Sequence, residues 1–168
     1  IYFNCNLSYA FNHDMIISMD INYVLLRQIS ILSVFFGAVL GAVTLIPYLG
    51  VVSFIFLLCL ISPIVIWLLT KYDCLSYLST KDSIIIGAIS GFVSYLGFSI
   101  IYVPISVILM KFFHIAANYG VGLMLEHASF FILVVISLFM GVLSATVNAF
   151  TGFLTFYVMD FLGVFRNK

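Results

Sequence analysis

Residues 28–70 read QISILSVFFGAVLGAVTLIPYLGVVSFIFLLCLISPIVIWLLT and contain no charged side chain. As a single α-helix this run of about 43 residues would be roughly 65 Å long, whereas the hydrocarbon core of a bilayer is about 30 Å thick. The run must therefore fold back on itself. Its turn chemistry lies at Pro47-Tyr48-Leu49-Gly50, where proline fixes φ and glycine frees it. We expect a tight hairpin of two spans, residues 29–46 and 51–70.

The charged residues of the chain lie in four short clusters that separate the apolar runs. A charge held at the centre of a bilayer costs about 2.5–3.5 kcal/mol on insertion scales, so long uncharged runs are typical of membrane spans. Residues 83–110 and 128–159 are also uncharged, and they predict spans three and four at residues 83–110 and 129–158. The clusters are Asp14, Asp20 and Arg27; Lys71, Asp73, Lys81 and Asp82; Lys111 and Glu126; and Asp160, Arg166 and Lys168.

The composition excludes several classes of protein. Hydrophobic residues make up 65% of the chain and charged residues 7%, against about 25% charged in an average soluble domain. The few scattered basic residues give no nucleic-acid-binding surface. The three cysteines show neither a CxxC pair nor a Cys/His metal-ligand spacing, so we expect no metal and no cofactor. The sequence predicts an integral membrane protein.

We expect an all-α bundle of four transmembrane helices, with residues 29–160 as the membrane domain and residues 161–168 as a cytoplasmic tail. Between spans three and four, His114, Asn118, Gly122 and Glu126 recur every four residues. This spacing places them on one helical face and predicts an interfacial helix in that connection. Residues 1–28 are expected to form an N-terminal cytoplasmic segment. Translation is expected to start at Met15 or Met19, which would leave residues 1–14 or 1–18 untranslated.

The distribution of Lys and Arg predicts the orientation. With four spans, one side of the membrane holds Arg27, Lys71, Lys81, Arg166 and Lys168, and the other side holds Lys111. Cytoplasmic loops carry the excess of basic residues. Both termini are therefore expected in the cytoplasm, with the protein in the inner membrane of a bacterial cell.

Small residues recur at spacings of three and four along spans one, three and four, which places them on one face of each helix. Helices in lipid gain little hydrophobic energy by associating, so small residues serve mainly to let two backbones approach closely. We expect such packing at GxxxG pairs in spans one and three and at a glycine in span four. These glycines are Gly37, Gly41, Gly87, Gly91 and Gly141.

Asn148 is the most polar residue deep in any expected span, and an amide there needs a hydrogen-bond partner. Two interpretations follow: Asn148 ties the bundle together, or it lines a polar path. The path would be built from Asn148, Ser144 and Thr151 of span four facing Ser90 and Ser94 of span three. Pro63 and Pro104 are expected to interrupt spans two and three as kinks, because proline frees the carbonyl four residues before it.

The run from Gly37 to Lys71 is followed by GAISGFVSYLGF at residues 87–98. With its glycine spacing and hydropathy, this region resembles small four-span bacterial inner-membrane proteins of uncharacterised families. The resemblance covers most of the chain after Met19 and implies a helical-hairpin architecture. It implies no activity, and no functional residue is carried over from it.

Three functional hypotheses remain open. The expected partners are the lipid bilayer and either a second copy of the chain or another membrane protein. The first hypothesis is a non-enzymatic structural or accessory subunit that packs through its Gly/Ser faces and predicts a partner protein. The second is a small oligomeric transporter-like or channel-like protein with a path along the Asn148 face. The third, weaker hypothesis is a lipid-acting enzyme using Glu126 and His127; no catalytic residue is assigned.

Overall fold

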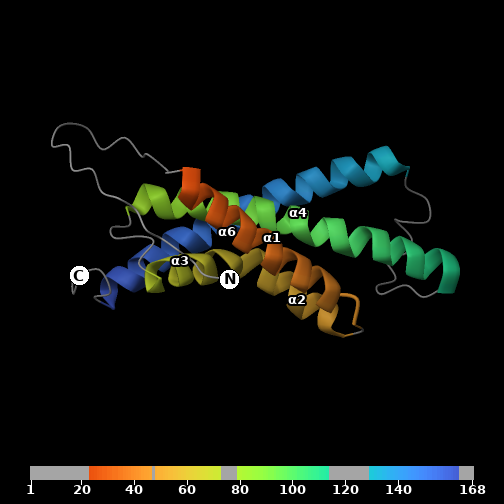
Figure 1. Ribbon diagram of the computed structural model, residues 1–168, viewed down its shortest axis with the longest axis horizontal. Helices are drawn as coiled ribbons and strands as arrows, with labels where there is room; N and C mark the ends of the chain where they lie inside the picture. Colours follow the sequence, from red (N-terminus) through yellow and green to blue (C-terminus); the bar gives the residue numbers. More distant parts are fainter. Residues whose placement is uncertain (1–22, 47, 73–78, 114–128, 163–168) are drawn as a thin grey trace.

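The computed structural model describes residues 23–46, 48–72, 79–113 and 129–162 (Figure 1). These residues form five α-helices and contain no strand, which confirms the all-α prediction. The helices are α1 (Tyr23–Val43), α2 (Leu49–Cys59), α3 (Ile61–Lys71), α4 (Thr80–Phe113) and α6 (Phe130–Phe161). The expected interfacial helix, together with Glu126 and His127, lies outside the described residues.

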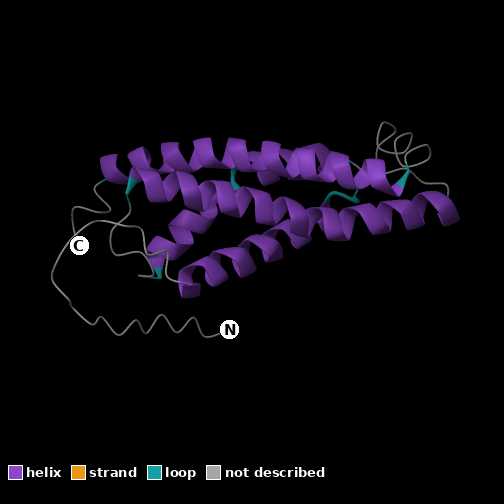
Figure 2. Cartoon of the chain, turned by 90° about the horizontal axis from the view of Figure 1, so that it is seen from above, coloured by secondary structure: helices purple, strands orange, loops and turns teal. Residues whose placement is uncertain are grey.

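Helix α4 is the centre of the bundle, with α1 packed on one side and α6 on the other. Helices α1 and α4 run in the same direction, and α3 and α6 run in the opposite direction (Figure 1). Helix α3 packs against both α4 and α6, whereas α2 lies along the far half of α1. Seen from above, α4 and α6 are the long helices, and both extend beyond the shorter α2–α3 pair (Figure 2).

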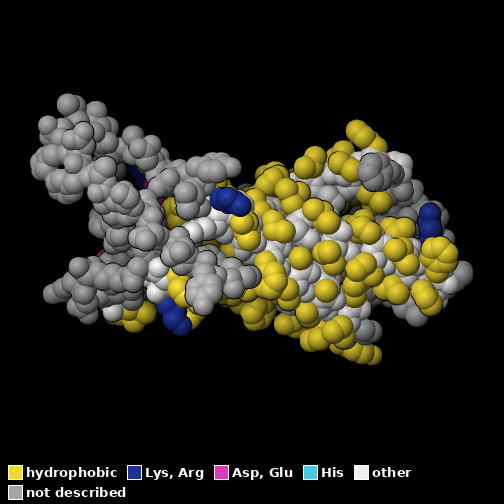
Figure 3. All heavy atoms as spheres, in the orientation of Figure 1, with side chains coloured by type: hydrophobic (Ala, Val, Ile, Leu, Met, Phe, Trp, Pro, Cys, Tyr) yellow, Lys and Arg dark blue, Asp and Glu magenta, His cyan; other side chains and the backbone are white. Residues whose placement is uncertain are grey.

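The interior of the bundle contains small polar side chains beside apolar ones, and its outer surface is apolar, unlike that of a soluble domain. Ser33, Ser90, Ser94, Ser144 and Asn148 are fully buried. Large apolar side chains cover the outer surface, where Figure 3 shows them between basic groups at the two ends of the molecule. The most exposed of them along the helices include Phe35, Val51, Ile100, Phe139 and Phe150. Such an apolar surface is suited to a lipid environment.

Helices α1, α4 and α6 are each long and apolar enough to cross a membrane, and α2 and α3 pass the same test only as a bent pair, which is either a broken fourth span or a re-entrant segment. The chain is therefore a membrane protein by length and composition of its helices. Three of the four predicted spans correspond to α1, α4 and α6 with shifted ends. At about 1.5 Å per residue, α4 is roughly 51 Å long, more than the hydrocarbon core of about 30 Å, so it tilts or projects.

The predicted second span is two helices rather than one, because α2 and α3 meet at Leu60 with a bend of 57°. Pro63 explains the break: it is the third residue of α3, a position in the first helical turn where its missing N–H has no intrahelical role. Pro104, by contrast, lies within the continuous helix α4. Only the first of the two prolines thus stands beside a helix end.

The turn between α1 and α2 differs from the prediction, in which Gly50 supplied the unusual backbone conformation. Gly50 is helical, within the first turn of α2, and the left-handed residue is Tyr48, with φ 73°. The small size of Gly50 has another use, since a Cβ there would lie 3.3 Å from the carbonyl oxygen of Thr44 at the end of α1. Gly50 therefore lets the two helix ends approach, and Tyr48 makes the turn.

Glycines hold α4 against both of its neighbours. A Cβ on Gly37 would overlap the carbonyl group of Ser94 in α4. A Cβ on Gly97 would lie 2.7 Å from the carbonyl oxygen of Val34 in α1. On the other side, a Cβ on Gly91 would stand 2.6 Å from the Ser144 oxygen of α6. Gly141 packs differently, because the nearest atoms to its Cβ position belong to the Phe92 ring, 3.2 Å away. The glycine faces are thus occupied within the chain.

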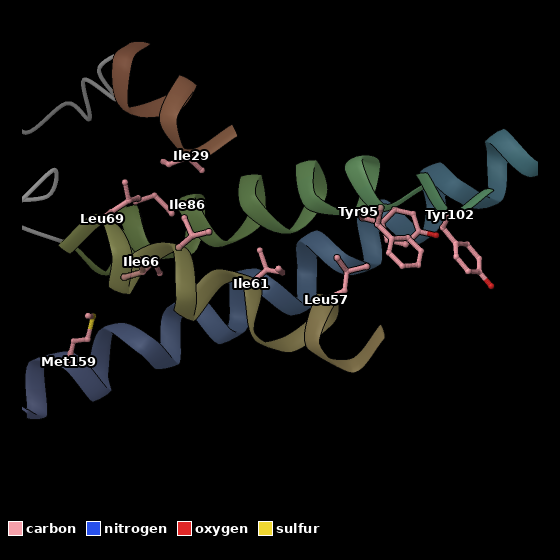
Figure 4. Close-up of a cluster of buried hydrophobic side chains, with 11 residues drawn as sticks. Ile29, Leu57, Ile61, Ile66, Leu69, Ile86, Tyr95, Tyr102 and Met159 are labelled. Atoms are coloured by element: carbon pink, nitrogen blue, oxygen red, sulfur yellow. The ribbon is translucent and has the colours of Figure 1, made fainter. Parts of the chain in front are cut away.

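An apolar cluster fills the space between the helices beside these glycine contacts (Figure 4). Leu57 and Ile61 enter it from the two sides of the α2–α3 break. On α4, the rings of Phe98 and Tyr102 stack with centroids 5.1 Å apart. The ring of Phe54 in α2 packs beside that of Phe98, with centroids 6.4 Å apart. The cluster joins α2 and α3 to the central helix.

We expect Gly37→Ala to lower the free energy of unfolding by about 2–3 kcal/mol, because the added methyl group would overlap the α4 backbone, which cannot rotate away. Gly141→Ala is the matched control: its neighbour is a side-chain ring that can shift, and the loss should stay within about 1 kcal/mol. Unfolding of both variants in mixed detergent micelles, followed by helix content, measures the difference. Equal losses would contradict the backbone-contact account.

Tyr48 carries a left-handed backbone with its side chain 98% exposed. Since a non-glycine residue pays about 1 kcal/mol for this conformation and glycine does not, Tyr48→Gly should raise stability by up to about 1 kcal/mol. Tyr48→Ala keeps the Cβ and should give no such gain. Thermal unfolding of the two variants measures the difference. If the tyrosine side chain made stabilising contacts, both variants would be less stable than the wild type; if the backbone is strained, only Tyr48→Gly gains stability.

Candidate functional site

The candidate site is centred on Asn148, in the middle of α6, whose side chain is fully buried. Its Nδ2 donates to the carbonyl of Leu57 at 3.1 Å and to the carbonyl of Ser144 at 3.0 Å. Its Oδ1 accepts a hydrogen bond of 3.0 Å from the backbone N–H of Ser62. One amide thus joins α6 to the last turn of α2 and to the first turn of α3.

The partners of Asn148 in α2 and α3 are backbone groups that lose their usual helical hydrogen bond at the break. In an unbroken helix the Leu57 carbonyl would accept from residue 61, and the Ser62 N–H would donate to residue 58. The first N–H groups and last carbonyls of a helix have no such partner. Here the carboxamide of Asn148 supplies both a donor and an acceptor, so it takes the place of a peptide group across the break.

The Ser62 side chain has a different environment from its backbone. Its Oγ is buried and has no hydrogen-bond partner among the described groups. It lies 2.9 Å and 2.7 Å from the positions that a Cβ would occupy on Gly87 and Gly152. One turn away, Ser83 Oγ donates to the Gly152 carbonyl at 2.6 Å. The Ser62 hydroxyl therefore fills the space left by two glycines, and the three helices α3, α4 and α6 meet there.

Each of the five residues of the predicted polar path donates to a carbonyl of the protein. Ser144 Oγ bonds across to Gly91 of α4 at 3.0 Å, while Thr151 Oγ1 bonds to Asn148 of its own helix. Ser90 and Ser94 donate to the carbonyls three residues before them. The structure therefore brings Asn148 and Ser144 against Gly91, and gives the hydroxyls of Ser90 and Ser94 partners within α4.

The described part of the chain has few reactive or charged side chains away from Asn148. There, no group of three or more His, Cys, Asp or Glu side chains is close enough to hold a metal ion. Among the described residues, Cys59 is a free cysteine, half-buried at the end of α2. At the end of α3, the ammonium group of Lys71 lies 4.9 Å from the centroid of the Trp67 ring.

Sequence reasoning identified Asn148 and missed its partners Leu57 and Ser62. These partners are backbone groups, which carry no residue-type signal. The informative pattern was the dipeptide Ser62-Pro63, because proline is favoured in the first turn of a helix and predicts a start there. Interpreted in that way, the dipeptide gives unpaired N–H groups at residues 61 and 62 that need an acceptor from elsewhere.

Comparison of the chain with protein-family models, with curated proteins and with solved structures finds no match.

We expect Asn148→Leu to lower the free energy of unfolding by about 1–2 kcal/mol, because its hydrogen bonds to Leu57 of α2 and Ser62 of α3 are lost, at about 0.6 kcal/mol each in a membrane. Ser62→Ala is the matched control. It removes a hydroxyl that has no partner and keeps the backbone N–H bond to Asn148, so stability should change by less than about 0.5 kcal/mol. The same mixed-micelle unfolding measures both, and a large loss in Ser62→Ala would contradict the assignment.

Proposed function

We propose that this protein is a non-enzymatic, four-span subunit with a structural or accessory role in a membrane assembly. Helices α2 and α3 together form the second crossing, which gives four crossings and places both chain ends on one side. Arg27, Lys71 and Lys81 lie at helix ends on that side, and Lys111 lies at the opposite end of α4. By the positive-inside rule, that side is the cytoplasm in the inner membrane of a bacterium.

The observation that supports this proposal best is that the residues of the predicted polar path form hydrogen bonds within the protein. Three other buried hydroxyls have no partner among the described groups: those of Ser33, Ser62 and Ser106. The amide of Asn148 is engaged with three helices, and Ser144, Ser90 and Ser94 donate to carbonyls. An interior of this kind stabilises one arrangement of helices and offers few free groups to a solute. Since the glycine faces are also occupied within the chain, a partner would meet the outer apolar faces of α1, α2 or α6.

The test is the composition of the native assembly. The full chain, purified in native lipid without strong detergent, is expected to carry a second membrane protein in fixed stoichiometry, measured by the mass of the intact complex. Asn148→Leu should reduce the yield of this complex in proportion to its loss of stability, while Ser62→Ala should keep it. A homo-oligomer or a monomer as the sole species would overturn the accessory role.

A second candidate function is a transporter-like or channel-like protein, and the α2–α3 break favours it. Discontinuous helices that face a buried polar residue near mid-membrane are found at the binding sites of secondary transporters. This candidate predicts a homo-oligomer, with solute flux into vesicles that Asn148→Leu abolishes and Ser62→Ala preserves. Flux that is absent in the wild-type chain, or unaffected by Asn148→Leu, would reject it.

A further inference from the structure

The two halves of the broken span are held to the bundle very differently. In α3, Ile61, Ser62, Val65, Ile66, Leu69 and Thr70 are all buried, in a helix of 11 residues. In α2, a helix of the same length, the buried residues are Ser53 and Leu57. Val51, Val52, Ile55 and Phe56 expose between 43% and 65% of their surface. Helix α3 is therefore part of the core, whereas α2 lies on its edge.

The joint between these halves has little backbone continuity. The Leu60 N–H closes the last turn of α2 on Phe56, and the Leu60 carbonyl accepts from Ile64 in the first turn of α3. Between these bonds, Pro63 has no N–H to give to the Cys59 carbonyl. The Leu57 carbonyl and the Ser62 N–H are both directed to Asn148. The bond from Asn148 to Leu57 therefore ties the end of α2 to α6.

At its other end, α2 begins after the turn at Tyr48, whose side chain is exposed and whose backbone is left-handed. Along its length, Phe54 contacts Phe98 of α4, and Gly50 approaches Thr44 at the end of α1. Few packed contacts and a bend at each end are the features of a segment that opens at low free-energy cost.

From these observations we infer that α2 is a hinged half-helix that swings about Leu60, and that Asn148 is the latch that holds it closed. In the open state the Asn148 bond to Leu57 is broken and Phe54 leaves Phe98, while the Ser62 N–H remains bonded to Asn148. Helix α3 stays fixed on α4 and α6. The inference does not depend on the accessory role, because a hinge of this kind serves a subunit and a transporter equally.

Distances between spin labels test this directly in the full chain, reconstituted in lipid after Cys5, Cys59 and Cys74 are replaced by Ser. One pair carries labels at the exposed positions Val52 of α2 and Phe150 of α6, and the reference pair at Trp67 of α3 and Phe150. The α2 pair should give a broad or two-peaked distance distribution, and the α3 pair a narrow one.

The latch is tested in the same two pairs by Asn148→Leu, with Ser62→Ala as the control that keeps every Asn148 bond. Because the hydrogen bond from Asn148 to Leu57 is the one that the closed state has and the open state lacks, its loss should raise the open population roughly threefold. This rise should appear in the α2 pair, with the α3 pair and the Ser62→Ala protein unchanged. The inference is overturned if the α2 pair is as narrow as the α3 pair, or if both pairs broaden together in Asn148→Leu.

Should Asn148→Leu not fold, the wild-type distances alone still test the hinge, because an α2 pair as narrow as the α3 pair would overturn it whatever the native assembly contains.

Discussion

Every backbone N–H and C=O inside a membrane needs a hydrogen-bond partner from the protein, because the hydrocarbon offers none. A straight helix satisfies this requirement by itself, but the α2–α3 pair is bent by 57° at Leu60. The backbone groups that this break leaves without a helical partner, the Leu57 carbonyl and the Ser62 N–H, are paired by the single amide of Asn148. The bend between α2 and α3 and the position of α6 therefore depend on each other.

The glycines make this arrangement sterically feasible. Gly91 has no Cβ, and the Cβ of Asn148 lies in the space that one would fill, 2.6 Å from that position. Gly87 and Gly152 together leave room for the Ser62 hydroxyl. Any side chain at these positions would push α6 or α3 outward and lengthen the bonds to Asn148. Close helix packing and polar pairing are therefore one structural feature, and α4 is central because its glycines accept neighbours on two sides.

The fold was predictable where it depends on bulk properties, and less so where it depends on individual backbone groups. The long uncharged, apolar runs predicted helical spans, because the cost of placing a segment in the membrane is a sum over its residues. Pro63 was predicted to kink the second span, but the complete break into two helices at Leu60 was not predicted, since Pro63 is compatible with both a kink and a helix start. Gly50 was expected to supply the backbone freedom of the turn, whereas Tyr48 has the left-handed conformation and the small size of Gly50 serves close packing. At the site, Asn148 could be identified by its polarity, whereas its backbone partners gave no signal in the sequence.

A buried amide of this kind contributes more to the choice among structures than to total stability. Hydrogen bonds between helices in membranes are worth only about 0.6 kcal/mol on average, because the separated helices also find partners. If α6 slid along α4 by one turn, however, Asn148 would face an unbroken stretch of helix whose backbone groups are already paired. It would then be buried without partners, while the Leu57 and Ser62 groups would be left open. The apolar and glycine contacts alone discriminate weakly against such shifts, since small residues recur every three or four positions on both helices. Asn148 therefore selects the register of α6 by matching the one break in the opposing backbone, as single buried polar residues do in coiled coils.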